Sequence, residues 1–175
     1  VASLHKDMSQ WDLSIKYLMQ ALEQAQLLEL YDYQLTILNN LGTAVSNIQD
    51  YAKAERIFRQ GLDLSQKVGF VRQEILFNSN LGCLKITASK HKEAIAYYDK
   101  CIELLESISQ PPPPPLLIDI YNNYSLCYWR LKQHDKALYY INQAIEIAKS
   151  SNFPRDKVQM EINKTNLLVD VGDYA

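Results

Sequence analysis

A short segment recurs along this chain at nearly constant intervals. Three copies share the order polar, ring-bearing, any residue, charged, alanine, and they end at Ala54, Ala94 and Ala137. A fourth, degenerate copy runs over 10–14 and ends at Ser14. Successive copies lie 40, 40 and 43 residues apart. A fixed period in this range is typical of a solenoid, in which each unit buries its apolar face only against its neighbours.

Between these segments the apolar residues follow helical spacing. Residues 35–48 carry one stripe along a helix, and residues 51–66 repeat the pattern. The interval between the two consists of Gln49 and Asp50, which is too short for anything but an antiparallel neighbour. The first stripe consists of Leu35, Leu38, Leu41, Val45 and Ile48, and the second of Ala54, Ile57, Phe58, Leu62 and Leu64.

The same hairpin pattern recurs along the rest of the chain. We predict three hairpins, over 31–68, 70–109 and 116–151, flanked by half-units over 1–30 and 154–175. The half-units contain lone helices over 11–29 and 155–171, and Gly69 and Pro154 mark joints as a C-cap and a helix stop would. We expect one array over 1–175, and the absence of an initiator Met suggests a fragment of a larger protein.

The signature residues resemble those of the tetratricopeptide repeat family. That family places a Leu and a small residue on the first helix of each unit, and Ala, an aromatic residue and Ala on the second. The resemblance covers the whole chain, although these units are longer than the usual ~34 residues. It implies an all-α, right-handed superhelical solenoid of antiparallel helix hairpins. The matching positions are Leu38, Leu41, Gly42, Ala54 and Phe58, then Leu81, Gly82, Ala94 and Tyr98, then Tyr121, Tyr124, Ser125, Tyr128, Ala137, Ile141 and Ala144.

The small residues of the signature predict close helix crossings. Gly42, Gly82 and Ser125 let the two helices of a hairpin approach, and a larger side chain there would overpack at a cost of ~1–3 kcal/mol. In the last unit Glu161 and Lys164 occupy positions that are usually apolar, so its register is the weakest. Gly172, Asp173 and Tyr174 resemble the turn of one more unit.

An asparagine stands two residues before each small signature position, on all four first helices. Asparagine is a poor helix former, because its side chain competes for backbone hydrogen bonds, so the recurrence needs a reason. In tetratricopeptide arrays this position faces the concave groove, and the series resembles the asparagine ladders with which kinesin light chains and O-GlcNAc transferase hold extended peptides. A carboxamide matches the N–H and C=O of a peptide backbone. The alternative is that the residues bond neighbouring helices or water. The series is Asn40, Asn80, Asn123 and Asn163.

The same register predicts the other groove positions, which are polar and nearly neutral. The family's clamp for terminal carboxylates needs several cations there, and only Arg130 qualifies. Trp129 with Arg130 is the best candidate anchor, since both types are enriched in binding hot spots, although Trp129 packed between helices fits equally. The predicted peptide-binding positions are Thr43, Asn47, Trp129, Arg130 and Asn166 beside the four asparagines, and Asn39, Ser79, Cys83, Thr87, Asn122, Leu126 and Asp170 share the face.

Other residues fit structural roles. His91 and His134 share one repeat slot with Trp11, Tyr51 and Tyr174, a slot that opens the second helix, so packing or capping is favoured over catalysis or metal binding. Pro111 to Pro115 form a run expected to adopt polyproline II as a stiff loop, with an SH3 or WW ligand as the alternative. No metal, phosphate or nucleophile motif is present, so we expect no cofactor, no metal site and no enzyme activity.

Composition and net charge limit the classes of molecule that the chain is expected to bind. A net charge of −2 favours neither nucleic acid nor an anionic membrane, and no apolar stretch approaches the ~20 residues of a membrane span. The three cysteines, Cys83, Cys101 and Cys127, form no CxxC pair and predict reduced, buried thiols in a reducing compartment such as the cytoplasm.

The function that the sequence predicts is protein or peptide binding in the groove of a scaffold module. One alternative is a ligand- or peptide-sensing regulatory domain of a signalling or transcription-control protein, similar to bacterial peptide-pheromone receptors. Another is a scaffold that self-associates weakly through its terminal half-repeats, where apolar faces lack a covering neighbour.

Overall fold

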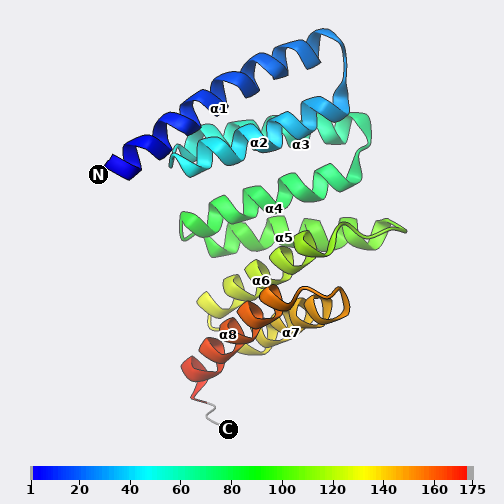
Figure 1. Cartoon of the computed structure of the whole chain (residues 1–175). Helices are drawn as coiled ribbons and strands as arrows, with labels where there is room; N and C mark the ends of the chain where they lie inside the picture. The colour runs from blue at the N-terminus through cyan, green and yellow to red at the C-terminus, as the bar shows by residue number, and fades with distance from the viewer. Residues whose placement is uncertain (1, 173–175) are drawn as a thin grey trace. The chain divides into compact units, whose positions relative to one another are not determined.

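The computed structural model describes the backbone over residues 2–172 and the side chains over 11–170 and 172. The described residues form eight α-helices and no strand (Figure 1). The chain falls into two compact units, Val1–Leu81 and Gly82–Ala175, and the boundary lies inside one helix. The helices are α1 (Ala2–Leu27), α2 (Tyr31–Asn47), α3 (Tyr51–Val68), α4 (Val71–Thr87), α5 (His91–Ser107), α6 (Pro114–Arg130), α7 (His134–Ser150) and α8 (Pro154–Val171).

The helix pattern of the sequence is confirmed, with boundaries that shift by a few residues. One shift is a correction: α1 begins at Ala2, so Trp11 does not open a helix. Residues 2–13 contain neither Gly nor Pro, and nothing in them stops the helix. His91 and His134 do open α5 and α7, as predicted, whereas Tyr174 lies outside the described residues.

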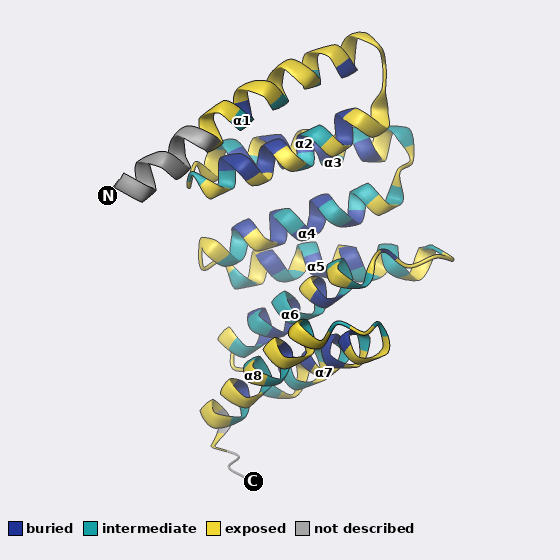
Figure 2. Cartoon of the chain, in the orientation of Figure 1, coloured by how far each residue is buried: buried dark blue, intermediate teal, exposed yellow. Residues whose placement is uncertain are grey.

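In the first unit the core forms where α2 packs on α3. Leu35, Leu38 and Val45 of α2 and Ala54 of α3 are at most 1 % exposed (Figure 2). A Cβ placed on Gly42 would overlap the ring of Phe58, and one on Gly61 would overlap Phe77. The predicted close crossing at Gly42 is therefore present, and Gly61 provides a second one that the sequence pattern did not reveal.

In the second unit the core continues with the same registers. A Cβ on Gly82 would lie 2.8 Å from Cζ of Tyr98, which confirms that close crossing. Ser125 is buried, and its Oγ donates to the Ala137 carbonyl at 2.7 Å. A further cluster joins α6, α7 and α8, and it consists of Ile118, Ile141, Ala144, Ile145, Ala148 and Met160.

The turns between helices share one backbone device. Gln49, Ser89 and Lys132 occupy the same repeat position between first and second helices, and all three have φ between 58° and 64°. Gly69 ends α3 with φ 73°, as a C-cap glycine does, and Gly172 ends α8 with φ 78°. A left-handed residue therefore reverses the chain even where its identity is not glycine. The predicted turn beyond Gly172 lies outside the described residues.

Two sequence expectations need correction. The proline run is not a loop throughout, because α6 begins at Pro114, where a missing N–H costs nothing in the first turn. Only its start is extended, with Pro113 at φ −54° and ψ 140°, and Pro112 is buried, which removes it from a partner's reach. All three cysteines are free, but Cys83 is exposed rather than buried, which agrees with the groove-face position that the repeat register also assigns to it.

Candidate functional site

Two of the four ladder asparagines pair with asparagines of the preceding first helix. In the first unit Asn80 Nδ2 donates to Asn39 Oδ1 at 2.8 Å. In the second unit Asn163 Nδ2 donates to Asn122 Oδ1, also at 2.8 Å. Both bonds join residues 41 positions apart, so they are one repeat contact made twice. The second bond also shows that Asn163 of α8 occupies the same repeat position as Asn80 of α4. The sequence had indicated this register least clearly, because Glu161 and Lys164 stand at positions that are usually apolar.

These amide pairs are only partly saturated. A carboxamide offers two N–H donors and two acceptor lone pairs, and a single pair bond uses one of each kind between two residues. Asn163 additionally accepts from Gln159 Nε2 at 3.1 Å, and Asn40 accepts from Asn39 Nδ2 at 3.4 Å. Each pair is half-buried and keeps donors and acceptors for another molecule. The arrangement thus shows the helix-to-helix bond that was one of the two alternatives, and the predicted ligand contact remains a prediction.

The remaining positions of the first unit lie along α2. Asn40, Thr43 and Asn47 are exposed, and Asn47 is the last residue of the helix. The Thr43 hydroxyl donates to the Asn39 carbonyl at 2.9 Å, which leaves its oxygen lone pairs as acceptors. This unit therefore presents a polar, uncharged strip. Ser79, by contrast, is buried at 6 % exposure and is not available on this face.

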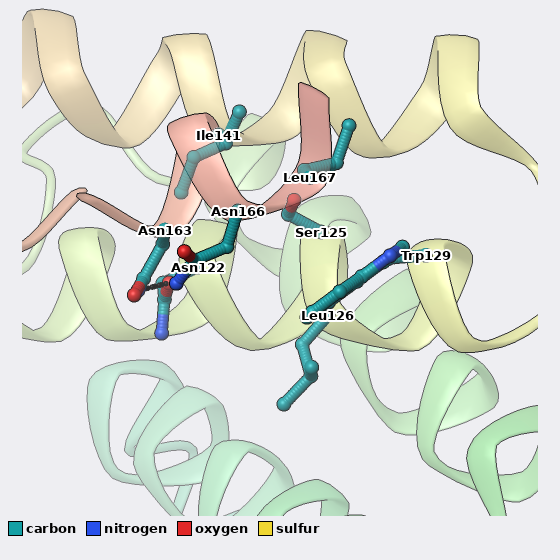
Figure 3. Close-up of a pocket in the computed structure, with 8 residues that line it drawn as sticks. All are labelled: Asn122, Ser125, Leu126, Trp129, Ile141, Asn163, Asn166 and Leu167. Carbon is teal, nitrogen blue, oxygen red and sulfur yellow. Dashed lines mark hydrogen bonds between the residues drawn. The ribbon is translucent and has the colours of Figure 1, made fainter. Parts of the chain in front are cut away.

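In the second unit the same face contains a pocket of about 140 Å³ (Figure 3). One wall is polar, formed by Asn122 and Asn163 with Asn166 beside them, and the other is apolar. Binding pockets for drug-sized ligands are ~300–1,000 Å³, so this one suits a single side chain. It is lined by Asn122, Ser125, Leu126, Trp129, Ile141, Asn163, Asn166 and Leu167.

Trp129 and Arg130 lie together at the end of α6. The Trp129 indole Nε1 donates to Asp170 Oδ2 of α8 at 3.0 Å, so the ring that lines the pocket is held in place from its far edge (Figure 3). Arg130 Cζ lies 5.0 Å from the centre of the same ring, within cation–π distance. The two residues that the sequence paired as an anchor are therefore in contact, and Arg130 is exposed.

Asn123, the remaining ladder residue, lies beside the buried hydroxyl of Tyr98. Burial, followed by the neighbouring cysteines Cys83, Cys127 and Cys101, raises the pKa of the Tyr98 phenol far above its ordinary value. The phenol therefore stays protonated and neutral beneath this part of α6. The sequence placed Tyr98 in the core but did not connect it with the ladder.

The two histidines of the repeat slot lie at the starts of second helices. His91 and His134 are half-buried at the starts of α5 and α7, and the Nδ1 atom of each is buried without a hydrogen-bond partner among the described residues. Burial and the charge of Arg130 lower the pKa of His91, which keeps the ring neutral. Within the described part of the chain, no three His, Cys, Asp or Glu side chains gather as a metal site would require.

The sequence revealed only part of the apolar half of the pocket, because Leu126 and Trp129 were placed on the groove face and the rest was not. Ser125 and Ile141 were assigned to helix packing alone, and Leu167 was not singled out. The three come from α6, α7 and α8, and no spacing along one helix predicts that they share a cavity. The signal that could have suggested it is the change from Phe58 and Tyr98 to Ile141 at one repeat position, which replaces a ring by a smaller side chain.

The chain belongs to the tetratricopeptide repeat family. The family's model matches residues 1–67 and 76–150. Domains of this family are generally protein-binding modules without catalytic activity. No curated protein matches the chain.

Solved structures show the same fold at low identity. BtubC (BKLC) from P. vanneervenii superposes with a TM-score of 0.80 at 21 % identity, covering 98 % of this chain and 70 % of that one. A Rap protein in complex with competence and sporulation factor superposes with a TM-score of 0.76 at 18 % identity, covering 95 % of this chain and 46 % of that one. Bacillus thuringiensis PlcR, in complex with the peptide PapR7 and DNA, superposes with a TM-score of 0.67 at 14 % identity, covering 96 % of this chain and 62 % of that one. The fold class is thus the predicted one, an all-α tetratricopeptide-like superhelix of helix hairpins.

In the described part of the chain, no helix combines the length and the apolar character needed to cross a bilayer.

Proposed function

We propose that the chain is a scaffold module that binds an extended segment of a partner protein or peptide along its first helices. The observation that carries the proposal is the pocket of the second unit, where three asparagines face Trp129 across a space for one side chain. The spare donors and acceptors of Asn122, Asn163 and Asn166 would bind the backbone of the segment. Backbone bonds accept any sequence, and the apolar wall adds a preference for an apolar side chain.

The first unit, taken by itself, offers the same polar chemistry. Its strip of Asn40, Thr43, Asn47 and Asn80 is polar and lacks a charged side chain among those four residues. Such a strip favours contacts with the backbone of the bound segment over selection of particular side chains.

The location of the protein is also part of the proposal. The reduced cysteines that the sequence predicts are consistent with the cytoplasm, and we propose that location.

The test uses peptides rather than a guessed partner. A random peptide display selection on the purified chain should yield binders. To follow binding by fluorescence, Trp11 is replaced by Phe, so that Trp129 is the one tryptophan left in the sequence. Titration with a selected peptide should change the Trp129 emission. Asn166→Ala should weaken binding by roughly fivefold, since a lost hydrogen bond costs on the order of 1 kcal/mol. Asn142→Ala, an exposed asparagine of α7 outside the pocket, is the matched control. Equal loss in both variants would contradict the proposed site.

A peptide-sensing regulatory role is the second candidate. It is favoured by the similarity in fold to PlcR, which was solved with a peptide bound. A sensor must respond to a free peptide, whereas a scaffold holds a segment of a larger protein. Binders that lose their affinity when embedded in a carrier protein would favour sensing.

Self-association is a third candidate, and exposed apolar side chains at both ends support it. Leu13 and Tyr17 of α1 are 52 % and 61 % exposed, and Leu28, which follows that helix, is 66 % exposed (Figure 2). Val158 and Ile162 of α8 are 58 % and 48 % exposed. Apolar patches of this kind favour association. Sedimentation velocity over a range of concentrations should show a weak dimer that Tyr17→Lys removes. A strictly monomeric chain at high concentration would exclude this candidate.

A further inference from the structure

One edge of the second unit is basic, although the unit as a whole is balanced. Residues 82–175 contain equal numbers of Lys plus Arg and of Asp plus Glu. The turns that join α4 to α5 and α6 to α7, together with the helix ends beside them, nevertheless concentrate cations, and we call this surface the basic edge. It consists of Lys90, Lys92, Arg130, Lys132 and Lys136, and the carboxylates among them are Glu93 and Asp135.

The two turns of the basic edge are neighbours in space and each is hollowed. The first hollow is lined by Ser89, Lys90, His91, Lys92, Glu93 and, from the other turn, Leu131. The second is lined by Lys132, Gln133, His134, Asp135 and Lys136. Because Leu131 lines the first hollow and Arg130 acts on the charge state of His91, the cations of both turns belong to one surface.

Most of these cations are not neutralised by a local carboxylate. Glu93 pairs with Lys90 at 3.3 Å and with Lys85 at 3.8 Å, so it already serves two lysines. Lys136 Nζ lies 5.0 Å from the centre of the Tyr128 ring, and Arg130 lies against Trp129. Lys92 and Lys132 are exposed. The equivalent turn of the first unit contains Asp50, which caps α3 by accepting from the Lys53 N–H at 3.1 Å, so a basic turn is not a requirement of the fold.

The basic edge begins where the pocket ends. Trp129 lines the pocket, and Arg130 on its ring is the first cation of the edge. A segment that places a side chain in the pocket and continues past Trp129 therefore passes over Arg130 toward the two turns. Its residues there would meet positive charge that has few protein partners.

We propose that the partner segment is acidic on the side that follows its pocket residue, and that Asp or Glu side chains of the segment bind the basic edge. This inference rests on the proposed function, because it specifies the chemistry of the segment bound there. A protein segment is favoured over nucleic acid, because the chain carries a net charge of −2 and the cations occupy one edge instead of a broad face. Carboxylates spaced along an extended peptide suit two separate hollows better than a continuous phosphate backbone does.

The test compares two fluorescein-labelled peptides by anisotropy at low and moderate salt. One repeats glutamate, glycine and leucine, and the other has glutamine at every glutamate position. The glutamate peptide should bind about tenfold more tightly, with a steep salt dependence that the glutamine peptide lacks. Lys92→Glu with Lys132→Glu should abolish that difference and leave the affinity for the glutamine peptide unchanged.

The matched control is Lys16→Glu with Lys67→Glu, which changes the net charge equally on exposed lysines of the first unit. It should keep the preference for glutamate, and circular dichroism should show both double variants folded. Equal binding of the two peptides, or an equal loss in both double variants, would overturn the proposal. So would a duplex DNA that binds more tightly than the glutamate peptide.

The outcomes also separate this proposal from the one on which it rests. If the glutamine peptide binds and Asn166→Ala weakens it while glutamate gives no advantage, the peptide site stands and the acidic preference is wrong. If neither peptide binds but a selected peptide does and is weakened by Asn166→Ala, the acidic preference is again wrong and the peptide site stands. If no selected peptide binds either, both proposals are wrong.

Discussion

The hairpins α2/α3 and α6/α7 differ in the residues at the point where their two helices cross. In the first, Gly42 lies under the ring of Phe58, and a Cβ there would overlap the ring. In the second, the equivalent residues are Ser125 and Ile141, and both line the pocket. The Ser125 side chain is held by its bond to the Ala137 carbonyl. The comparison indicates that the partner across the crossing decides whether the space is filled or left open, and that the pocket exists because a ring is missing.

The largest effect is expected at the crossing that combines a glycine with a ring. Gly82→Leu places a side chain where even a Cβ would lie 2.8 Å from Tyr98. We expect a loss of about 3 kcal/mol or more, and because coupling in a solenoid is between neighbours, the loss should spread along the array. Thermal unfolding followed by circular dichroism measures it, with Gly82→Ala as a milder variant. A melting curve like that of the parent would show that this crossing is not close.

A double-mutant cycle tests the comparison itself. Ile141→Phe introduces the ring found in the first hairpin, and opposite Ser125 it should overpack and cost about 1–3 kcal/mol. Adding Ser125→Gly reproduces the combination of Gly42 and Phe58 and should recover much of that loss, although it removes the bond to Ala137. Ser125→Gly alone should destabilise by about 1 kcal/mol from the lost hydrogen bond.

The same cycle has a binding readout. In the doubly substituted chain the ring would occupy part of the pocket, so affinity for a displayed peptide should fall even though stability returns. Additive stability losses in the double variant would mean that the two positions do not share the crossing. Unchanged peptide affinity would mean that the pocket is not where the peptide binds.

The hairpins and their close crossings could be predicted from the sequence because they depend on local pattern. The stripe from Leu35 to Val45 and the small residue at Gly42 are visible in one helix at a time. The turns were less visible, since Gln49, Ser89 and Lys132 adopt a left-handed conformation without being residues that favour it. The short connection between packed helices imposes that conformation, and residue identity does not signal it.

The candidate site also has a part that the sequence could predict and a part that it could not. The asparagine register is a property of each first helix and could be read from the spacing of Asn40, Asn80, Asn123 and Asn163. That Asn80 would pair with Asn39, and Asn163 with Asn122, depends on how successive hairpins stack, which spacing alone does not specify. The basic edge was also missed, because its cations come from two turns separated by about one repeat and the overall charge is close to zero.

The smallest effects are expected at the two asparagine pairs, and they separate the structural role from the binding role. Asn80→Ala and Asn163→Ala each remove one bond between neighbouring first helices, at 2.8 Å in both cases. Because the residues are half-buried, each change should destabilise its unit by at most about 1 kcal/mol. If the pairs serve only stacking, the two variants should bind a selected peptide as the parent does.

Under the proposed function Asn163→Ala lowers the affinity by roughly fivefold, since Asn163 also lines the pocket. Asn80→Ala should have the smaller effect, because its strip offers backbone contacts without an apolar pocket wall. Chemical denaturation and peptide titration on the same samples give both quantities, and a larger binding loss for Asn80→Ala would shift the principal site to the first unit.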